Sequence, residues 1–258
     1  MISLLKSSKL GMGVRKVKKI AGNRLNKART IKRNRRDLGT SLSQIPFLTD
    51  YNTSKIDPNG IIRSAYEEYT NSISSPVATI SLELAYVLWF ILTKQRPRQL
   101  IDLGSGFSSY LFRLYQRDCE SAGGTCQVFS CDDDSLWLQR TSDFLTSKRL
   151  SVSGLLLWDK LLEEQRRVSP NLVLHDLGSS WVRLRTLPRV LELCNPNTIL
   201  VVDDIHKPSI RQAVLDSVQS RARCYDLAKL TYDRFGRYAW LINDFSAGAR
   251  NAQGVKNS

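Results

Sequence analysis

The chain has 258 residues, of which 42% are hydrophobic and 24% are charged, and its formal net charge at pH 7 is +14. This length suits one α/β domain with additions, large enough to bury a core. The most apolar window, residues 85–92, is far shorter than the roughly 20 residues of a membrane-spanning helix, so the globular part is expected to be soluble.

The positive charge is concentrated at the start of the chain. Residues 1–40 contain 13 Lys and Arg and one acid, Asp37, whereas the rest is close to neutral. Apolar residues recur here on one helical face among basic ones, which is typical of a helix lying on anionic lipid. We therefore expect a basic N-terminal tail or amphipathic helix over residues 1–40. An anionic membrane surface is one candidate partner of residues 1–36. An acidic partner, nucleic acid, a mitochondrial targeting peptide and an unspecific solvated tail are the other interpretations.

The cysteines and the apolar residues at the start of the chain indicate the cellular compartment of the protein. Lys6 and Lys9 interrupt that stretch, which predicts no secretory signal. The five cysteines are an odd number without CxxC spacing, and three of them lie in or beside apolar segments. Small buried thiols of this kind are typical of a reducing compartment, so a cytoplasmic protein, peripheral at a membrane if the tail binds one, is expected.

Residues 41–97 are predicted to be a linker followed by N-terminal cap helices. Pro46, Pro58 and Gly60 make residues 41–60 irregular, and helical periodicity then covers residues 61–72 and 77–94. From residue 98 strands and helices alternate. The expected strands are residues 98–103, 126–131, 153–158, 171–176 and 198–203; the expected helices between them are residues 108–118, 135–148, 187–194 and 208–220. Pro188 predicts that the helix after Ser180 starts late or is broken.

The end of the domain departs from this alternation. Residues 224–232 and 237–243 are two strand-like runs joined by residues 233–236, which predicts a hairpin. The whole pattern predicts an α/β, Rossmann-like fold: a seven-stranded, mostly parallel sheet with an antiparallel terminal hairpin and helices on both faces. This core is expected over residues 98–245, and residues 246–258 as a polar C-terminal tail.

Residues 99–110 are the most informative segment, because a strand there ends in an acid and a Gly-x-Gly turn before a helix begins. Glycines let a ligand approach the backbone, and the start of a helix offers free N–H groups. Ligands of open α/β sheets bind beyond the carboxyl ends of the strands. Acids stand at those ends: Asp102, Asp132, Asp133, Asp134, Asp159, Asp176, Asp203 and Asp204.

Two kinds of nucleotide ligand compete for this turn. A dinucleotide motif requires a third glycine, where this chain has Ser109, and its pyrophosphate would be repelled by Asp102. A ligand with a cationic amino group and a sulfonium centre favours such an acid, and S-adenosylmethionine (SAM) is one. Asp132 or Asp133 then suits the two ribose hydroxyls.

Ile101-Asp102-Leu103-Gly104-Ser105-Gly106 resembles the first motif of the class I SAM-dependent methyltransferases, and the closing hairpin resembles their last two strands. Residues 174–178 (Leu-His-Asp-Leu-Gly) and 201–206 (Val-Val-Asp-Asp-Ile-His) resemble the branch of macrocin-type sugar and catechol-type O-methyltransferases. The resemblance spans residues 70–243. It implies a metal-assisted O-methyltransferase acting on a small hydroxylated acceptor such as a sugar or glycan. A catalytically inactive module of the same fold, tethered by its basic tail, is the alternative.

The resemblance also implies roles for individual residues. In that branch a divalent metal, here Mg²⁺, would be held by Asp176, Asp203 and Asp204 and would lower the pKa of an acceptor hydroxyl. The lysine base of the catechol type is replaced by Ser179, so His206 beside Asp204 is the predicted catalytic base, with His175 as its competitor. The predicted cofactor contacts are Asp102, Gly104, Ser105, Gly106, Phe107, Asp132, Asp133, Trp158 and Asp176.

Two further expectations concern the ligands. Trp158, at the end of the third strand, borders the adenine or is a plain core residue. A nucleic-acid acceptor is disfavoured because no Asn/Asp-Pro-Pro-Tyr/Phe motif follows the fourth strand and the core is nearly neutral.

Overall fold

The computed structural model describes residues 45–164, 168–218 and 221–246. All of them belong to the second of two units into which the chain divides, Leu42–Ser258. The expectations for residues 1–40, and those for the C-terminal tail beyond residue 246, lie outside the described residues.

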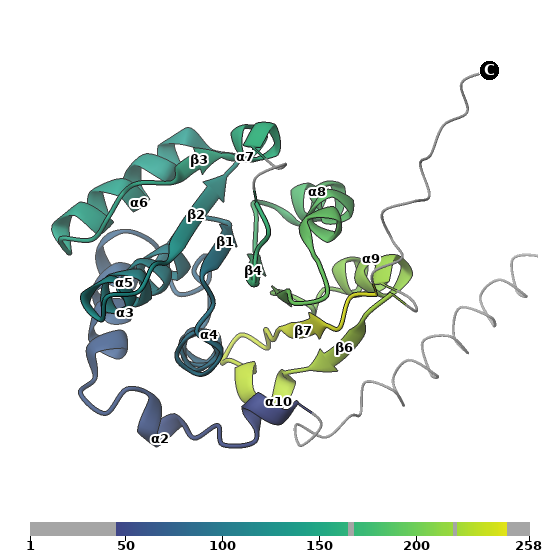
Figure 1. Ribbon diagram of the computed structural model, residues 1–258, viewed down its shortest axis with the longest axis horizontal. Helices are drawn as coiled ribbons and strands as arrows, with labels where there is room; N and C mark the ends of the chain where they lie inside the picture. The colour runs from purple at the N-terminus through teal and green to yellow at the C-terminus, as the bar shows by residue number, and fades with distance from the viewer. Residues whose placement is uncertain (1–44, 165–167, 219–220, 247–258) are drawn as a thin grey trace, which may run out of the picture. The chain divides into compact units, whose positions relative to one another are not determined.

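Seven strands of the described part form one sheet with the order β3-β2-β1-β4-β5-β7-β6 (Figure 1). They are β1 (Gln99–Leu103), β2 (Gln127–Asp132), β3 (Leu155–Leu157), β4 (Leu172–His175), β5 (Ile199–Val202), β6 (Arg223–Asp226) and β7 (Trp240–Asn243). The pairs from β3 to β5 are parallel, and β7 runs antiparallel to both β5 and β6. The predicted mostly parallel sheet with an antiparallel terminal hairpin is confirmed.

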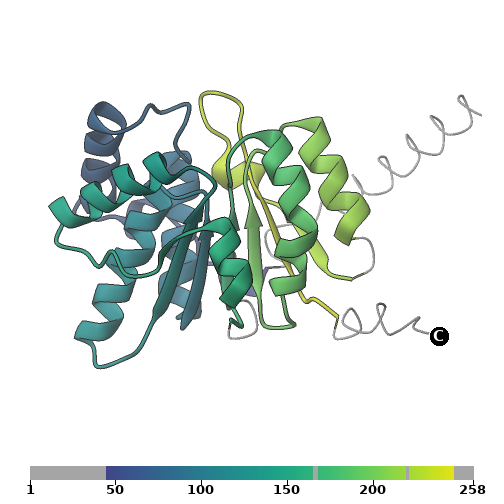
Figure 2. The same ribbon diagram turned by 90° about the horizontal axis from the view of Figure 1, so that it is seen from above.

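Helices cover both faces of this sheet (Figures 1 and 2). They are η2 (Pro46–Leu48), α2 (Thr53–Ile56), α3 (Ile61–Ser72), α4 (Leu82–Gln95), α5 (Phe107–Ser121), α6 (Ser135–Ser147), α7 (Trp158–Glu164), α8 (Ser180–Leu193), α9 (Pro208–Val218) and α10 (Ala228–Thr231). Helices α3 to α6 lie on one face, and α7, α8 and α9 lie on the other. No helix in the described ranges combines the length and the apolar character that crossing a membrane requires.

Helix α4 lies at the centre of the core. Its residues Leu88, Ile91 and Leu92 are fully buried in one cluster with Leu100 of β1 and Val201 of β5. Because α4 is covered by the sheet on one side and by other helices around it, it is apolar on nearly every face, as the sequence shows. Burial of this apolar area is the main stabilising contribution to the domain.

The five cysteines are free thiols, as the sequence predicts. Cys126, Cys131 and Cys194 are buried. Burial raises the pKa of Cys126 and Cys194 to about 12, so both are inert, protonated core residues.

The segment before α3 is more ordered than the predicted irregular linker. It contains η2 and α2, and Ile45 and Leu48 are both buried in the main core. Asn52 caps α2 by accepting a hydrogen bond from the N–H of Ser54. The sparse apolar residues here carry no periodicity, so packing rather than local pattern fixes their structure.

Two helices start at positions that their capping serines define. The Ser81 Oγ accepts a hydrogen bond from the N–H of Leu84, so α4 begins at Leu82 and not at residue 77. The Ser179 Oγ accepts from the N–H of Val182, and α8 therefore begins at Ser180. The prediction that Pro188 delays or breaks α8 is wrong: the helix runs through Pro188 because its buried face packs onto the sheet.

Two further differences between the predicted and the observed elements lie at the ends of strands. Strand β3 ends at Leu157, and Trp158 begins α7, a helix that the sequence did not predict. Strand β6 ends at Asp226, whose carboxylate accepts from the N–H of Ala228 and so starts α10 within the predicted strand 224–232. The turn at residues 233–236 is present: the N–H of Gly236 donates to the carbonyl of Asp233.

Candidate active site

The Gly-x-Gly turn between β1 and α5 packs directly against the end of β4. Gly104 has a φ of +102°, and a Cβ there would lie 2.4 Å from the carbonyl oxygen of Asp176. Both the backbone conformation and the close approach therefore require glycine at this position. The N–H of Gly104 also donates to the carbonyl of Cys131 in β2, so the turn joins three adjacent strand ends.

Asp102, in β1, is hydrogen-bonded to the first turn of α5. It is completely buried, and its Oδ2 accepts a 2.6 Å hydrogen bond from the Ser109 hydroxyl. The same hydroxyl accepts from the N–H of Gly106. The second oxygen, Oδ1, is buried and accepts no hydrogen bond from the described residues. Burial raises the pKa of Asp102 to about 6, against the Ser109 hydroxyl, which lowers it.

Asp132, at the end of β2, accepts hydrogen bonds from both the turn after β1 and the segment after β2. Its Oδ2 accepts from the backbone N–H of Ser105 at 2.8 Å and from the Ser105 hydroxyl at 3.1 Å, and its Oδ1 accepts from the N–H of Asp134. Burial raises the pKa of Asp132 to about 6. Trp137 of α6 adds a hydrogen bond from its indole N–H to the carbonyl of Ser105.

Asp133 is the exposed member of the pair predicted to meet the ribose. Its carboxylate lies against Gly178 in the loop after β4, where φ is +52° and a Cβ would lie 2.7 Å from Oδ1. Of the two ribose candidates, Asp132 already makes three hydrogen bonds within the chain, and Asp133 is the one open to solvent.

The Phe107 side chain is buried among aromatic residues. Its ring is 1% exposed, stacks on Tyr110 and meets Tyr66 of α3 edge-on at 5.1 Å. Only its backbone N–H, in the first turn of α5, remains for the predicted cofactor contact. Trp158 is also buried, at the start of α7.

Helix α3 packs against the beginning of α5, where Tyr66 and Tyr69 contact the Phe107 ring. The Tyr69 hydroxyl is the atom nearest to a Cβ built on Gly106, at 3.1 Å. This hydroxyl is buried and has no hydrogen-bond partner in the described part of the chain. Sequence reasoning missed Tyr69, because an aromatic residue at helical spacing is usually a core residue.

The acids at the ends of β4 and β5 meet around a side chain that the sequence did not single out, Arg183 of α8. Its Nη2 lies 2.5 Å from Asp176 Oδ1, and its Nη1 lies 2.8 Å from Asp204 Oδ2. Nη2 also donates to the carbonyl of Gly178 at 3.4 Å. The Lys207 ammonium lies 2.5 Å from the same Asp204 oxygen. Asp203 accepts a 2.6 Å hydrogen bond from the N–H of Asp204.

Burial, like charges and opposite charges all act in this cluster. Burial and the neighbouring Asp203 and Asp204 raise the pKa of Asp176 to about 8, against Arg183, which lowers it. Burial alone would lower the pKa of Arg183, but Asp176 and Asp204 hold it above its ordinary value. Burial acts to raise the pKa of Asp204, and Arg183 and Lys207 reverse this and hold it below its ordinary value. Asp204 also has a φ of +59°, in the left-handed region, where a non-glycine residue is strained.

The two histidines have different surroundings. His206 is partly exposed, and its Nδ1 lies 3.5 Å from Asp204 Oδ1; burial lowers its pKa below the ordinary value. His175 is buried, its Nε2 lies 3.2 Å from the carbonyl of Arg183, and burial lowers its pKa to about 4. His175 is therefore a neutral core residue, and His206 is the histidine at the rim.

These residues do not fit a metal ion. No group of three His, Cys, Asp or Glu side chains is placed to hold one among residues 45–164, 168–218 and 221–246. Asp176 and Asp204 face the Arg183 guanidinium rather than a shared empty position, and the Asp203 oxygen is used by a backbone N–H. The set Asp176, Asp203 and Asp204 expected to ligate Mg²⁺ is thus not assembled as ligands, because the chain supplies its own cation.

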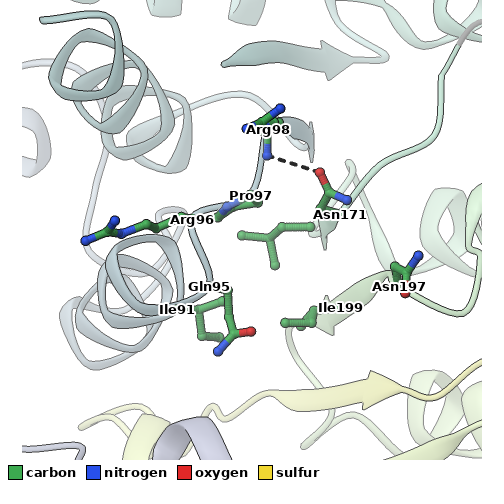
Figure 3. Close-up of a pocket in the computed structure, with 9 residues that line it drawn as sticks. Ile91, Gln95, Arg96, Pro97, Arg98, Asn171, Asn197 and Ile199 are labelled. Carbon is green, nitrogen blue, oxygen red and sulfur yellow. Dashed lines mark hydrogen bonds between the residues drawn. The ribbon is translucent and has the colours of Figure 1, made fainter. Parts of the chain in front are cut away.

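Two cavities of the described part lie away from all these residues. One of about 290 Å³ is at the amino ends of the strands, where the N–H of Arg98 donates to Asn171 (Figure 3). Another, of about 780 Å³, lies between α2 and α4 and is lined by Tyr51 and Trp89 among others. Neither is lined by a residue predicted to bind cofactor or metal or to act in catalysis.

Solved structures share this fold, although no family model and no curated protein matches the chain. An SAH-bound methyltransferase of Podospora anserina is similar with a TM-score of 0.52 and 10% identity over 75% of this chain and 94% of that chain. The O-methyltransferase from Bacillus cereus, in complex with SAH, has a TM-score of 0.52 and 12% identity over 74% of this chain and 94% of that chain. The cofactor-bound protein Rv0187 from MTB has a TM-score of 0.53 and 13% identity over 74% and 93%. The chain has the fold of the class I SAM-dependent methyltransferases.

Proposed function

We propose that this protein is a SAM-dependent O-methyltransferase that acts on a small hydroxylated acceptor. The observation that carries the proposal is the turn at Gly104, which packs on the carbonyl of Asp176 and brings Asp102, Asp132 and Asp133 to neighbouring strand ends. In this fold, ligands bind beyond these ends. The motifs at residues 174–178 and 201–206 favour a sugar or glycan as the acceptor.

The residues present suit each part of such a donor. The exposed carboxylate of Asp133 would accept hydrogen bonds from ribose hydroxyls, and the backbone N–H groups at the start of α5 would meet a carboxylate. The buried negative charge of Asp102, below the same turn, favours the positively charged part of the ligand. Gly104, Ser105 and Gly106 leave the backbone open to close approach.

The donor supplies an electrophilic methyl group, which an acceptor oxygen takes as the carbon–sulfur bond breaks. His206 would accept the hydroxyl proton as the new carbon–oxygen bond forms. Its lowered pKa keeps the imidazole neutral near pH 7, and Asp204 at 3.5 Å would orient the ring and stabilise the imidazolium. Positioning of the two reactants provides much of the rate enhancement in a displacement of this kind.

Isothermal titration with S-adenosylhomocysteine (SAH) tests the proposal. The full chain should bind SAH, and Asp133→Ala should weaken binding about 10- to 100-fold, the effect of losing hydrogen bonds to a charged group. Asp216→Ala, an exposed carboxylate on α9 that contacts Gln212, is the matched control and should bind like the unmodified chain. Absence of SAH binding by the unmodified chain would reject the proposal.

A further inference from the structure

The position between Asp176 and Asp204 is filled by a guanidinium group. The Arg183 side chain is 8% exposed and joins the ends of two parallel strands, β4 and β5, through one nitrogen each. Its third contact is the carbonyl of Gly178, in the loop between β4 and α8. A planar fork of donors with a permanent charge suits this double pairing, which a lysine could not reproduce in the same geometry.

A divalent ion at this position would have to displace the guanidinium. Arg183 projects from a helix whose buried face also carries Val182, Thr186 and Leu187. Its stem is therefore fixed by packing, and the group has little room to withdraw. A guanidinium left beside a divalent ion would be repelled by it in a mostly buried place, where such repulsion is strong.

We propose that Arg183 is the built-in cation of this site, standing where related folds would bind a metal between Asp176 and Asp204. Methyl transfer then runs without a divalent metal. This inference rests on the proposed function for its catalytic meaning, but the occupancy of the site can be tested without it.

Arg183 acts as a positioning residue. It pairs with the Asp204 oxygen that Lys207 also contacts, and the other Asp204 oxygen faces His206. The two cations hold Asp204 in its strained left-handed conformation and so fix the carboxylate that orients the base. A metal-bound acceptor is replaced in this arrangement by a protein-based Arg–Asp–His array.

Binding of Mn²⁺ to the full chain, measured by electron paramagnetic resonance in the presence of SAH, tests the inference. The unmodified chain should bind no Mn²⁺ stoichiometrically. Arg183→Gln leaves the carboxylates without their cation and should gain one bound Mn²⁺, which Asp204→Asn in the same background should remove. Arg185→Gln, an exposed arginine of the same helix that stacks on Trp181, is the matched control and should bind none.

Stoichiometric Mn²⁺ binding by the unmodified chain, lost in Asp204→Asn, would overturn the inference. A folded Arg183→Gln variant, checked by circular dichroism, that gains no Mn²⁺ would also contradict it. If Arg183→Gln does not fold, Mn²⁺ binding is compared between the unmodified chain and Arg183→Lys. This variant keeps the positive charge, so neither protein should bind Mn²⁺.

SAH titration of the same samples separates the two proposals. Absence of SAH binding by the unmodified chain would reject the methyltransferase function. Stoichiometric Mn²⁺ binding by a chain that also binds SAH would reject only the role of Arg183.

Discussion

Asp102 and Asp132 show how single residues build the first turn of the site. Each is a carboxylate at the end of a buried strand, and each accepts hydrogen bonds from the turn at residues 104–106 or from the helix that follows it. The sequence identified both residues from their position after apolar strands. Their contacts with Ser105 and Ser109 could not be predicted, because a serine after a turn does not reveal which acid it will face.

Arg183 is the residue of the cluster that sequence reasoning missed. Three acids at neighbouring strand ends, Asp176, Asp203 and Asp204, require compensating charge, and this requirement could have directed attention to a basic residue nearby. The predicted late start of the following helix placed Arg183 in a loop, so its periodicity with the buried Val182 and Leu187 was not considered. The metal prediction itself came from the resemblance at residues 174–178 and 201–206, which carries no information on Arg183.

The raised pKa of Asp102 predicts a pH-dependent stability difference. Its pKa rises from 3.8 to about 6 on folding, so the folded chain binds the extra proton between these values, and ionisation costs about 3 kcal/mol of stability above pH 6. Below the unfolded pKa both states are protonated and the cost disappears. Relative to the unmodified chain, Asp102→Asn should gain stability from pH 4 to pH 7.5 in urea titrations without ligand. A difference that is constant or of opposite sign would contradict the buried, ionisable state of Asp102.

At the scale of elements, apolar periodicity correctly predicted the helices and strands whose buried face follows the local sequence pattern. Helix α3 occupies the predicted residues 61–72, and the ends of all five parallel strands fall within two residues of expectation. The differences arise where tertiary packing prevails over local pattern. Helix α8 tolerates Pro188, and α10 forms inside an apolar run that alone favours a strand.

The turn between β1 and α5 predicts a large difference between two glycine substitutions. Gly104→Ala places a Cβ 2.4 Å from the Asp176 carbonyl at positive φ, whereas Gly123→Ala meets the same backbone strain, with φ +77°, in open space. We expect a loss of about 3 kcal/mol or more for Gly104→Ala and about 1 kcal/mol for Gly123→Ala. Urea denaturation measures both. Equal losses would show that the turn does not pack tightly on β4.

At the scale of the whole molecule, charge divides the chain into two parts. Residues 1–36 contain 13 basic residues and no acid, so their removal leaves a domain of nearly zero net charge. We predict that the full chain sediments with vesicles containing phosphatidylserine, and that a chain lacking residues 1–36 does not. Added salt should weaken this binding, since exposed charges are screened. Equal sedimentation of both proteins would assign the tail another role.

The deletion also separates tethering from catalysis. The residues proposed to bind the methyl donor all lie between Asp102 and Asp176, so the shortened chain should keep its affinity for SAH. Loss of SAH binding on deletion would show that the N-terminal segment contributes to the cofactor site.

The proposed function depends on the ligand being SAM or SAH and not a dinucleotide. Native mass spectrometry tests this most directly, with the purified chain incubated with equal amounts of SAH and NAD⁺. We predict one non-covalent adduct with the mass of SAH, lost or reduced in Asp133→Ala and retained in Asp216→Ala. An adduct with the mass of NAD⁺, or no adduct in the unmodified chain, would contradict it.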